Sequence, residues 1–257
     1  MPSSSSPSKR PEVSVLDAAE AARVVAREIA ELVRSKAARG ERTVLGLATG
    51  KTPMGVYREL LRLHREQGLS FARVTTFNLD EFVGLRPDDP RSFRAWMRRE
   101  LFDHVDLDPA HAHVPDGSGS PTTLDRECER YRERIRAAGG LDLQLLGIGK
   151  NGHIAFNEPG SSRDSRMRVV ELAPTTRASL AAEFGALERV PIHGLTLGVA
   201  DVLAARAIRL LAFGEGKRAI LERALQAPIG PDVPATFLRE HADVRWIADA
   251  AAAGHSR

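Results

Sequence analysis

The stretch Leu145-Leu-Gly-Ile-Gly-Lys-Asn-Gly-His-Ile-Ala-Phe-Asn-Glu-Pro-Gly-Ser-Ser162 decides the fold of this chain. Its first residues are the end of an apolar strand predicted over residues 141–148. Gly147, Gly149 and Gly152 then interrupt the apolar run and predict a turn. In open α/β sheets, ligands bind beyond the carboxyl ends of the strands. The loop that follows this strand is therefore a candidate reaction site.

This loop carries His153 and Glu158, five residues apart. Histidine titrates near neutral pH and is a natural proton shuttle, and a nearby carboxylate can hold its ring and tune its pKa. A lone histidine in such a loop more often satisfies a buried backbone group. Here four glycines and a proline converge on the His/Glu pair, which favours a reaction site.

Length and composition describe an ordinary globular protein. The 257 residues suffice for one large α/β domain or two small ones, and 42% are hydrophobic and 28% charged. The net charge of +3 is spread out, with no basic stripe for nucleic acid. Cys128 is the only cysteine, which excludes a disulfide framework and a thiolate metal cage. We expect no membrane span and no signal peptide, and therefore a cytoplasmic protein.

A second loop has the pattern of a phosphate site. Thr49-Gly-Lys-Thr52 follows a buried strand over 43–47 and precedes a helix predicted over 56–67. Backbone N–H groups and the dipole at a helix N-terminus favour an anion. The loop lacks the Walker A pattern. The alternative is a plain turn, with Thr52 as the helix cap and Pro53 in the first helical position.

Two further strand ends carry charged side chains. A strand over 74–77 is followed by the adjacent acids Asp80 and Glu81, which can divide a reactive and a structural role. The alternative is a solvated turn with a helix cap. Lys217 follows Gly214 and Gly216 at the start of a helix, where a lysine contacts phosphate as a point charge.

Alternating strands and helices predict an α/β fold with a mainly parallel sheet and helices on both faces. The loops after residues 47, 77, 148 and 213 should then lie near one edge of the sheet. We predict a disordered tail over residues 1–12 and a single α/β domain over 13–257. The expected strands are 13–16, 43–47, 74–77, 141–148, 190–199, 207–212 and 244–247, and the expected helices 18–38, 56–67, 92–102, 124–138, 174–187, 202–205, 214–226 and 234–241.

The run from Gly147 to Ser162 resembles the signature of the glucosamine-6-phosphate deaminases, also called glucosamine-6-phosphate isomerases. Further similar segments extend the resemblance over roughly residues 13–250, among them Asn78-Leu-Asp-Glu-Phe-Val-Gly-Leu85 and Pro234-Ala-Thr-Phe-Leu-Arg-Glu-His241. The resemblance implies a Rossmann-like three-layer sandwich. It also implies conversion of D-glucosamine 6-phosphate and water to D-fructose 6-phosphate and ammonia, without a metal or an organic cofactor. The expected partner is a small sugar phosphate, and the protein would be a monomer or a homo-oligomer.

The resemblance also implies roles for the site residues. Asp80 would move the proton between two carbons, with Glu81 as its structural neighbour. His153 would open the sugar ring, oriented by Glu158 with Asn151 nearby. The substrate and its phosphate would contact Thr49, Gly50, Lys51, Thr52, Glu81, Gly149 and Lys217.

Several positions depart from the family pattern. The arginine that commonly grips the phosphate is replaced by Ala182, and Lys51 stands where most members have a small residue. Our hypothesis is that Lys51 replaces this arginine, with Arg177 as the next candidate. Many members have aspartate where this chain has Asn151. This Asn can hydrogen-bond the ring of His153 but cannot stabilise an imidazolium by charge.

The family's allosteric site for N-acetylglucosamine 6-phosphate uses a serine and an arginine that match Ser161 and Arg168. A lysine usually follows two positions later, where this chain has Val170. We therefore expect weak or no activation by that ligand.

Three other functions stay open. A 6-phosphogluconolactonase shares the fold, but it needs no carbon-acid base and lacks the Phe156-Asn-Glu-Pro159 run. A non-catalytic sugar-phosphate sensor is compatible with Ala182, but not with an intact set of Asp80, His153 and Glu158. A deaminase for another amino-sugar phosphate, such as the galactosamine epimer, is the closest alternative.

Overall fold

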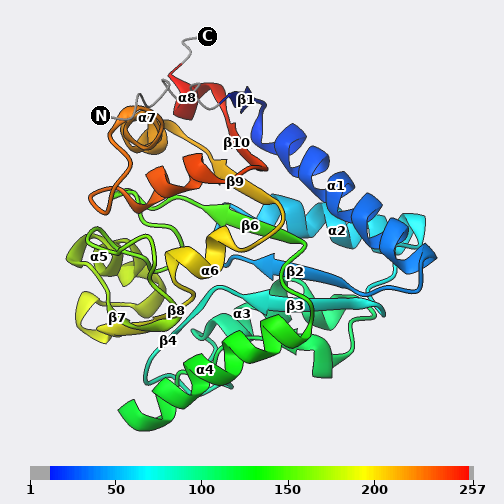
Figure 1. The fold of residues 1–257 in the computed structure, drawn as a ribbon, viewed down its shortest axis with the longest axis horizontal. Helices are drawn as coiled ribbons and strands as arrows, with labels where there is room; N and C mark the ends of the chain where they lie inside the picture. Colours follow the sequence, from blue (N-terminus) through cyan, green and yellow to red (C-terminus); the bar gives the residue numbers. More distant parts are fainter. Residues whose placement is uncertain (1–11, 255–257) are drawn as a thin grey trace, which may run out of the picture.

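A seven-stranded, fully parallel sheet forms the centre of the structure, a computed structural model that describes residues 12–254 (Figure 1). Its spatial order is β1-β10-β9-β6-β2-β3-β5. The strands are β1 (Val13–Val15), β2 (Thr43–Leu47), β3 (Val74–Asn78), β5 (Ala112–His113), β6 (Leu143–Gly147), β9 (Ile208–Ala212) and β10 (Val244–Ala248).

Helices cover both faces of this sheet and bury two separate apolar cores. On one face, α1 (Ala18–Ala38), α2 (Met54–Gln67) and α3 (Phe93–Glu100) pack on residues such as Leu45 and Leu145. On the other, α4 (Pro121–Ala137), α6 (Val199–Leu203), α7 (Arg218–Gln226) and α8 (Ala250–Ala253) pack on residues such as Leu146 and Trp246. The predicted three-layer α/β fold is confirmed.

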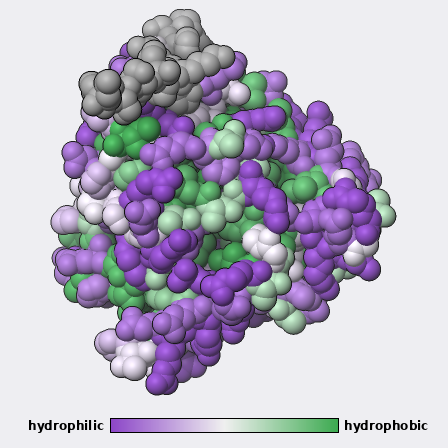
Figure 2. Space-filling model, in the orientation of Figure 1, coloured by the Kyte–Doolittle hydropathy of each residue, from purple (hydrophilic) through white to green (hydrophobic). Residues whose placement is uncertain are grey.

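The helices are amphipathic, which explains how one layer can cover the sheet and face water. In α1, the buried residues recur at three- and four-residue steps, from Ala21 and Val25 to Ile29 and Val33. Asp17 caps this helix, as predicted, since its carboxylate accepts the N–H of Glu20 at 2.7 Å. In Figure 2, hydrophilic residues cover the helices at the bottom and right of the view, and hydrophobic residues are visible between them.

A second, three-stranded sheet lies beside α5 (Pro174–Phe184) and carries part of the site. It consists of β4 (Asp80–Phe82), β8 (His193–Thr196) and β7 (Arg168–Glu171), in that order and antiparallel. Only one residue separates β3 from β4, so the chain passes directly from one sheet into the other. Asp80 therefore lies at the junction of the two sheets.

The sequence-based boundaries are wrong in this second sheet and near it. No strand was predicted at β4, β5 or β7, and the strand predicted over 190–199 is limited to His193–Thr196. Residues 234–240 form a 3₁₀ helix rather than an α-helix, and α4 begins three residues earlier than predicted. The division into a tail over 1–12 and one domain over 13–257 stays a prediction, because residues 1–11 and 255–257 lie outside the described residues.

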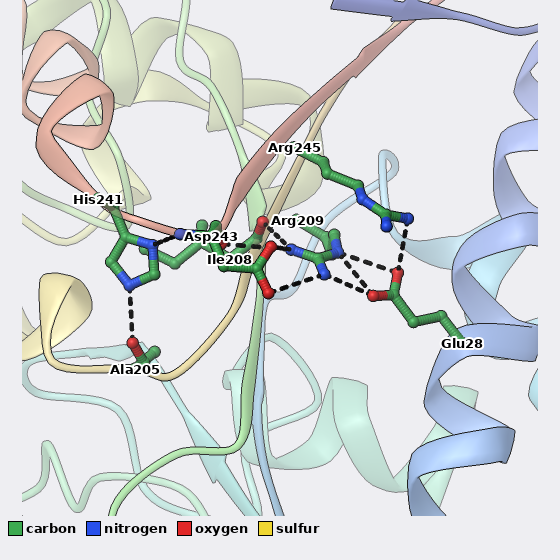
Figure 3. A network of polar contacts seen from close by, with 7 residues as sticks. All are labelled: Glu28, Ala205, Ile208, Arg209, His241, Asp243 and Arg245. Atoms are coloured by element: carbon green, nitrogen blue, oxygen red, sulfur yellow. Dashed lines mark hydrogen bonds and ion pairs between the residues drawn. The ribbon is translucent and has the colours of Figure 1, made fainter. Parts of the chain in front are cut away.

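A buried arginine ties α1 to the sheet (Figure 3). Arg209 on β9 is 2% exposed, and its guanidinium donates to the carboxylates of Glu28 on α1 at 3.0 Å and Asp243 at 2.8 Å. Asp243 directly precedes β10, so this network lies at the amino ends of the strands. It is therefore remote from the loops at the carboxyl ends.

Candidate functional site

The predicted loops meet at the carboxyl edge of the parallel sheet, because β9, β6, β2 and β3 are consecutive neighbours in it. A side-chain carbon placed on Gly147 would lie 3.8 Å from Thr52, so the loops after β6 and β2 are in contact. Lys217, which follows β9, donates from Nζ to the carbonyl of Ile148 at 2.6 Å. The phosphate-loop, His/Glu and lysine segments therefore converge, as predicted.

His153 is held through one of its two ring nitrogens. Its Nδ1 lies 3.3 Å from Oε2 of Glu158 and 3.3 Å from Oγ1 of Thr176 at the start of α5. A carboxylate only accepts hydrogen bonds, so the neutral ring carries its proton on Nδ1. The other nitrogen, Nε2, then presents a lone pair and can exchange protons with a ligand.

Gly149 has a packing role that the sequence analysis did not foresee. A side-chain carbon at this position would lie 2.2 Å from Cε1 of His153, so the imidazole rests directly on the glycine backbone. The Gly149 N–H also donates to the carbonyl of His153 at 2.9 Å. The structure thus explains the glycine by the seating of the histidine, and a contact from Gly149 to substrate stays a prediction.

Glu158 is an ionised carboxylate held on several sides. Burial alone would raise its pKa, but the hydrogen bonds from His153, Thr176 and Asn151, with the charge of His153, lower the pKa to about 2. Its Oε2 accepts from Nδ2 of Asn151 at 2.7 Å, and its Oε1 accepts the N–H of Ala173 at 3.2 Å. The carboxylate therefore keeps its charge across the physiological pH range.

Asn151 supports His153 and Glu158 but, contrary to expectation, does not bond the imidazole ring. Its Oδ1 accepts the backbone N–H of His153 at 3.2 Å, while its Nδ2 reaches Glu158. The side chain thus bridges the backbone of the histidine to its carboxylate partner. Charge stabilisation of an imidazolium is left to Glu158.

The loop beyond His153 is fixed by a residue that the sequence analysis missed. Asn157 is fully buried, and its Nδ2 donates to the carbonyls of Ile154 at 3.0 Å and Leu197 at 2.8 Å. Within this turn, Ala155 has φ +50°, a left-handed conformation that is uncommon for a residue with a side chain. Buried hydrogen bonds on both sides hold this conformation in place. The position of Asn157 inside the signature run, between Phe156 and Glu158, was the available signal.

Asp80 is a buried acid with a strongly perturbed pKa. It is 6% exposed, and within residues 12–254 its Oδ1 has no hydrogen-bond partner. Burial, followed by repulsion from the carboxylate of Glu81, raises the pKa of Asp80 to about 8. An acid that titrates near neutral pH in a site is suited to proton transfer.

Glu81 points instead to the start of α3. Its carboxylate accepts the N–H groups of Phe82 at 2.8 Å, Phe93 at 2.9 Å and Arg94 at 3.0 Å. Burial raises the pKa of Glu81 to about 7, although these backbone bonds and Arg94 oppose the rise. Such a carboxylate satisfies orphan donors at a helix N-terminus. These bonds agree with the role of structural neighbour, and a contact of Glu81 with substrate stays a prediction.

The loop after β2, predicted to bind phosphate, is partly exposed. Thr49, Gly50 and Thr52 are half-buried, and Gly50 has φ +89°. α2 begins at Met54 after Pro53, without a side-chain cap, so the turn capped by Thr52 is not observed. The hydroxyl of Tyr57, a residue missed by the sequence analysis, donates to the carbonyl of Ala48 at 2.5 Å and anchors the loop.

Lys51 and Lys217 differ in their surroundings. Burial, together with the charge of Lys150, lowers the pKa of Lys217, whose ammonium lies beside Ile148. Lys51 is exposed and makes no hydrogen bond or ion pair within the described part of the chain. Arg177 donates to the carbonyls of Leu187 and Val190, at 3.1 and 3.2 Å. Its guanidinium closes the turn after α5, which disfavours Arg177 as the missing phosphate cation.

Ser161 and Arg168 lie together, as their resemblance to an effector site implied. The guanidinium of Arg168 donates to Oγ of Ser161 at 2.9 Å and to Oδ1 of Asn157 at 3.0 Å. Val170, further along β7, packs against the small apolar cluster formed by Phe82, Phe156, Leu172, Phe184 and Val190.

Within residues 12–254, no group of three or more His, Cys, Asp or Glu side chains is placed to hold a metal ion. Over the same residues, none of the helices combines the length and apolar character that crossing a bilayer requires.

Comparison with known proteins places this architecture. Residues 16–246 match the family described as glucosamine-6-phosphate isomerases/6-phosphogluconolactonase. Glucosamine-6-phosphate deaminase 1 of Giardia intestinalis is 46% identical over 240 residues, which cover 93% of this chain and 88% of that protein. Glucosamine-6-phosphate deaminase 1 of Bacillus subtilis is 42% identical over 91% of this chain and 94% of its own.

Solved structures separate the two branches of the family. A monomeric glucosamine-6-phosphate deaminase superposes with a TM-score of 0.89 at 40% identity, covering 95% of this chain and 100% of that one. The 6-phosphogluconolactonase of Trypanosoma brucei has a TM-score of 0.76 at 22% identity, over 98% of this chain and 100% of its own, and so shares the fold alone. With the signature loop between β6 and β7 and relatives more than 40% identical over nearly its whole length, the chain belongs to the glucosamine-6-phosphate deaminase family.

Proposed function

We propose that this protein converts D-glucosamine 6-phosphate and water to D-fructose 6-phosphate and ammonia. The observation that carries the proposal is the pair of proton-transfer groups after β3 and β6, the two strands on either side of β2. Asp80 is a buried acid whose pKa is raised to about 8, and His153 is a histidine fixed by Glu158 with Nε2 available. Aldose–ketose isomerisation of an amino sugar needs such a base and such a shuttle.

His153 acts first in this mechanism, on the sugar ring. Its Nε2 takes the proton of the anomeric hydroxyl and returns one to the ring oxygen, which yields the open-chain aldehyde. Glu158 stabilises the transient imidazolium, since its pKa of about 2 keeps it charged throughout. Its contact with Nδ1 also leaves Nε2 as the ring nitrogen that exchanges protons.

Asp80 then performs the isomerisation. Its carboxylate removes the proton from C2 of the open-chain ammonium aldehyde, and a proton passes from the ammonium group to O1. The resulting enol-amine takes the proton back from Asp80 at C1. This shift gives a C2 iminium and a C1 alcohol, without net gain or loss of electrons. Water adds to C2 and ammonia leaves, which completes the ketose. A desolvated carboxylate is a stronger base than one in water, as this carbon acid requires.

The phosphate is held at the same edge of the sheet, by the segments that follow β2 and β9. The backbone of Thr49 to Thr52 and the ammonium of Lys217 offer N–H groups to a dianion. Because these groups follow β2 and β9 at the edge that also carries Asp80 and His153, phosphate binding positions the reacting carbons near both side chains. Substrate binding is thereby converted into orientation.

The direct test is release of ammonia from glucosamine 6-phosphate by the purified protein, with and without EDTA. We expect release that EDTA does not change. Absence of ammonia at saturating substrate would refute the proposal. Hydrolysis of 6-phosphogluconolactone by the same preparation would assign the protein to the other branch, and parallel assays with galactosamine 6-phosphate would define the epimer preference.

The pKa of Asp80 predicts the pH dependence of the reaction. Only the carboxylate form accepts the C2 proton, and this form dominates above a pKa of about 8. We expect kcat/KM to rise up to about tenfold per pH unit between pH 6 and pH 8 and then to level off. The reduced, open-chain 2-amino-hexitol 6-phosphate carries the same amine and phosphate as the substrate but does not react. The pH dependence of its binding constant over the same range therefore corrects the profile for titration of the substrate groups. A corrected profile that is flat from pH 6 to pH 8 would contradict the assignment.

Lys51 is predicted to supply the cation that Ala182 lacks. Lys51→Gly should raise the half-saturation concentration about ten- to hundred-fold, since a charge-assisted contact is worth about 1.5–3 kcal/mol. Lys150→Gly is the matched variant, because Lys150 is an exposed lysine near Lys217 but outside the phosphate loop. Equal effects of both variants would indicate that only the overall positive charge near the site matters. No effect of Lys51→Gly would show that the phosphate is held elsewhere.

Activation by N-acetylglucosamine 6-phosphate is predicted to be weak or absent. Arg168 is engaged by Ser161 and Asn157, and Val170 contributes no charge for a second phosphate contact. We expect substrate saturation curves with and without this ligand to coincide within about twofold, because one lost charged contact weakens binding at least tenfold. A large drop in half-saturation would show an intact effector site.

A further inference from the structure

Asn78, the last residue of β3, carries a side chain with no evident structural purpose. It is 0% exposed, and within residues 12–254 neither its Nδ2 nor its Oδ1 has a hydrogen-bond partner. Its backbone carbonyl accepts the hydroxyl of Tyr131 at 2.8 Å. Buried amides are almost always paired, and an unpaired one lowers stability. A leucine of similar size would fill the same space without this cost.

The position of Asn78 suggests why an amide is present. It lies two residues before Asp80, whose Oδ1 is also buried and without a partner in the described chain. Two residues span at most about 7 Å, so these two side chains are within reach of each other. The intervening Leu79 is buried in the core on the α4 face, whereas Asn78 aligns with Leu47, whose side chain belongs to the opposite core.

The other titratable neighbours of Asp80 do not donate a hydrogen bond to its Oδ1. The phenols of Tyr57 on α2 and Tyr131 on α4 lie close enough to feel its charge, but each donates to a backbone carbonyl. Glu81 is turned to the α3 N-terminus. Within residues 12–254, no donor is therefore committed to Oδ1 of Asp80.

We propose that Asn78 is a positioning residue for the base: its Nδ2 donates to Oδ1 of Asp80 when the carboxylate is ionised, which aims Oδ2 at the substrate carbon. The transferred proton is then carried on Oδ2, so Oδ1 can accept from Nδ2 in both states of Asp80. A carboxamide can make this bond because its nitrogen is a donor. The inference rests on the proposed deaminase reaction.

The experiment compares Asn78→Leu with the wild type in ammonia release, in the pH profile of kcat/KM and in thermal unfolding. We expect kcat to fall at least tenfold. The rise of kcat/KM with pH should move upward by about one pH unit, because a hydrogen bond that favours the ionised form is lost. The melting temperature should stay the same or rise, because two unpaired polar atoms are replaced by carbon.

Thr76→Val is the matched control. Thr76 lies on the same strand and face, two residues further from Asp80, and its hydroxyl is likewise buried and unpartnered within the described chain. This variant should leave the pH profile unchanged. Asn78→Ala serves as a second variant if Asn78→Leu does not fold, with the same expected shift.

The outcomes separate this inference from the proposed function. An inactive wild type would refute the deaminase reaction itself. An active wild type whose profile does not move in either Asn78 variant would refute only the role of Asn78. A fall in kcat with an unmoved profile would likewise overturn the inference, since it would indicate a packing role.

Discussion

Replacement of Asp80 by asparagine is expected to abolish turnover while substrate binding survives. The amide keeps the shape of the carboxyl group but cannot take a proton from carbon. Loss of a general base costs on the order of 10²–10⁴-fold in rate. The adjacent acid Glu81 is not placed to replace it, because its carboxylate accepts the N–H groups of Phe82, Phe93 and Arg94.

The measurement is kcat for ammonia release, with binding of the reduced 2-amino-hexitol 6-phosphate followed by calorimetry. Unchanged binding together with lost turnover would identify a group that acts in the transition state rather than in the ground state. Turnover close to that of the wild type in a folded Asp80→Asn variant would remove Asp80 from the mechanism.

The free energy of unfolding of Asp80→Asn, compared with that of the wild type, should show how much the buried Asp80 lowers stability. The pKa of Asp80 is about 8 in the folded protein, against an ordinary value of 3.8, so folding favours the protonated form. The burial of Asp80 therefore does not lower the free energy of unfolding of the wild type below pH 4, and it lowers this free energy progressively as pH rises towards 8. Asparagine does not titrate, so its relative stability should grow across this window, by up to about 1.4 kcal/mol per pH unit, and level off above pH 8. Urea unfolding of both proteins at several pH values measures the difference.

Replacement of His153 by glutamine is the second large effect that we expect. Glutamine can fill part of the space above Gly149 and form hydrogen bonds, but it cannot exchange a proton near neutral pH. Since the closed pyranose must open before Asp80 can act, kcat should fall about 10²–10⁴-fold. Ammonia release and the melting temperature, measured together, distinguish lost chemistry from lost folding.

Glu158→Gln is the matched variant for this test. It keeps an acceptor near Nδ1 of His153 but removes the charge that stabilises the imidazolium. We expect a smaller loss than for His153→Gln, because the proton shuttle itself is retained. If His153→Gln retained most of its activity while Glu158→Gln lost it, the assignment of the ring-opening step to the histidine would be wrong.

Much of the fold follows from local patterns in the chain. Apart from β5, the strands of the parallel sheet and the amphipathic helix α1 were predicted within a few residues. Most of these strands are short, largely apolar runs, and α1 has an amphipathic period. β4 and β7 were missed because they are three and four residues long and are stabilised by pairing with β8. Such pairing depends on residues more than 20 positions away and leaves no local pattern.

The site shows the same division. His153, Glu158, Asp80 and Lys217 follow strands or begin helices, and their convergence could be predicted from the parallel order alone. The contacts behind them could not. The hydrogen bond from Tyr57 to Ala48 and the contact of His153 with Thr176 depend on how α2 and α5 pack, which no spacing in the sequence encodes.

The pairing of β1 with β10 has a consequence for folding kinetics. Val13 aligns with Trp246, so one edge of the central sheet joins residues more than 230 positions apart. Contacts this distant in sequence close large loops and form slowly. During synthesis, β1 cannot pair until β10 has been made and has paired with β9. We therefore expect the part of the sheet made of β6, β2 and β3 to assemble first, and native activity to appear only after residues 244–248 have left the ribosome.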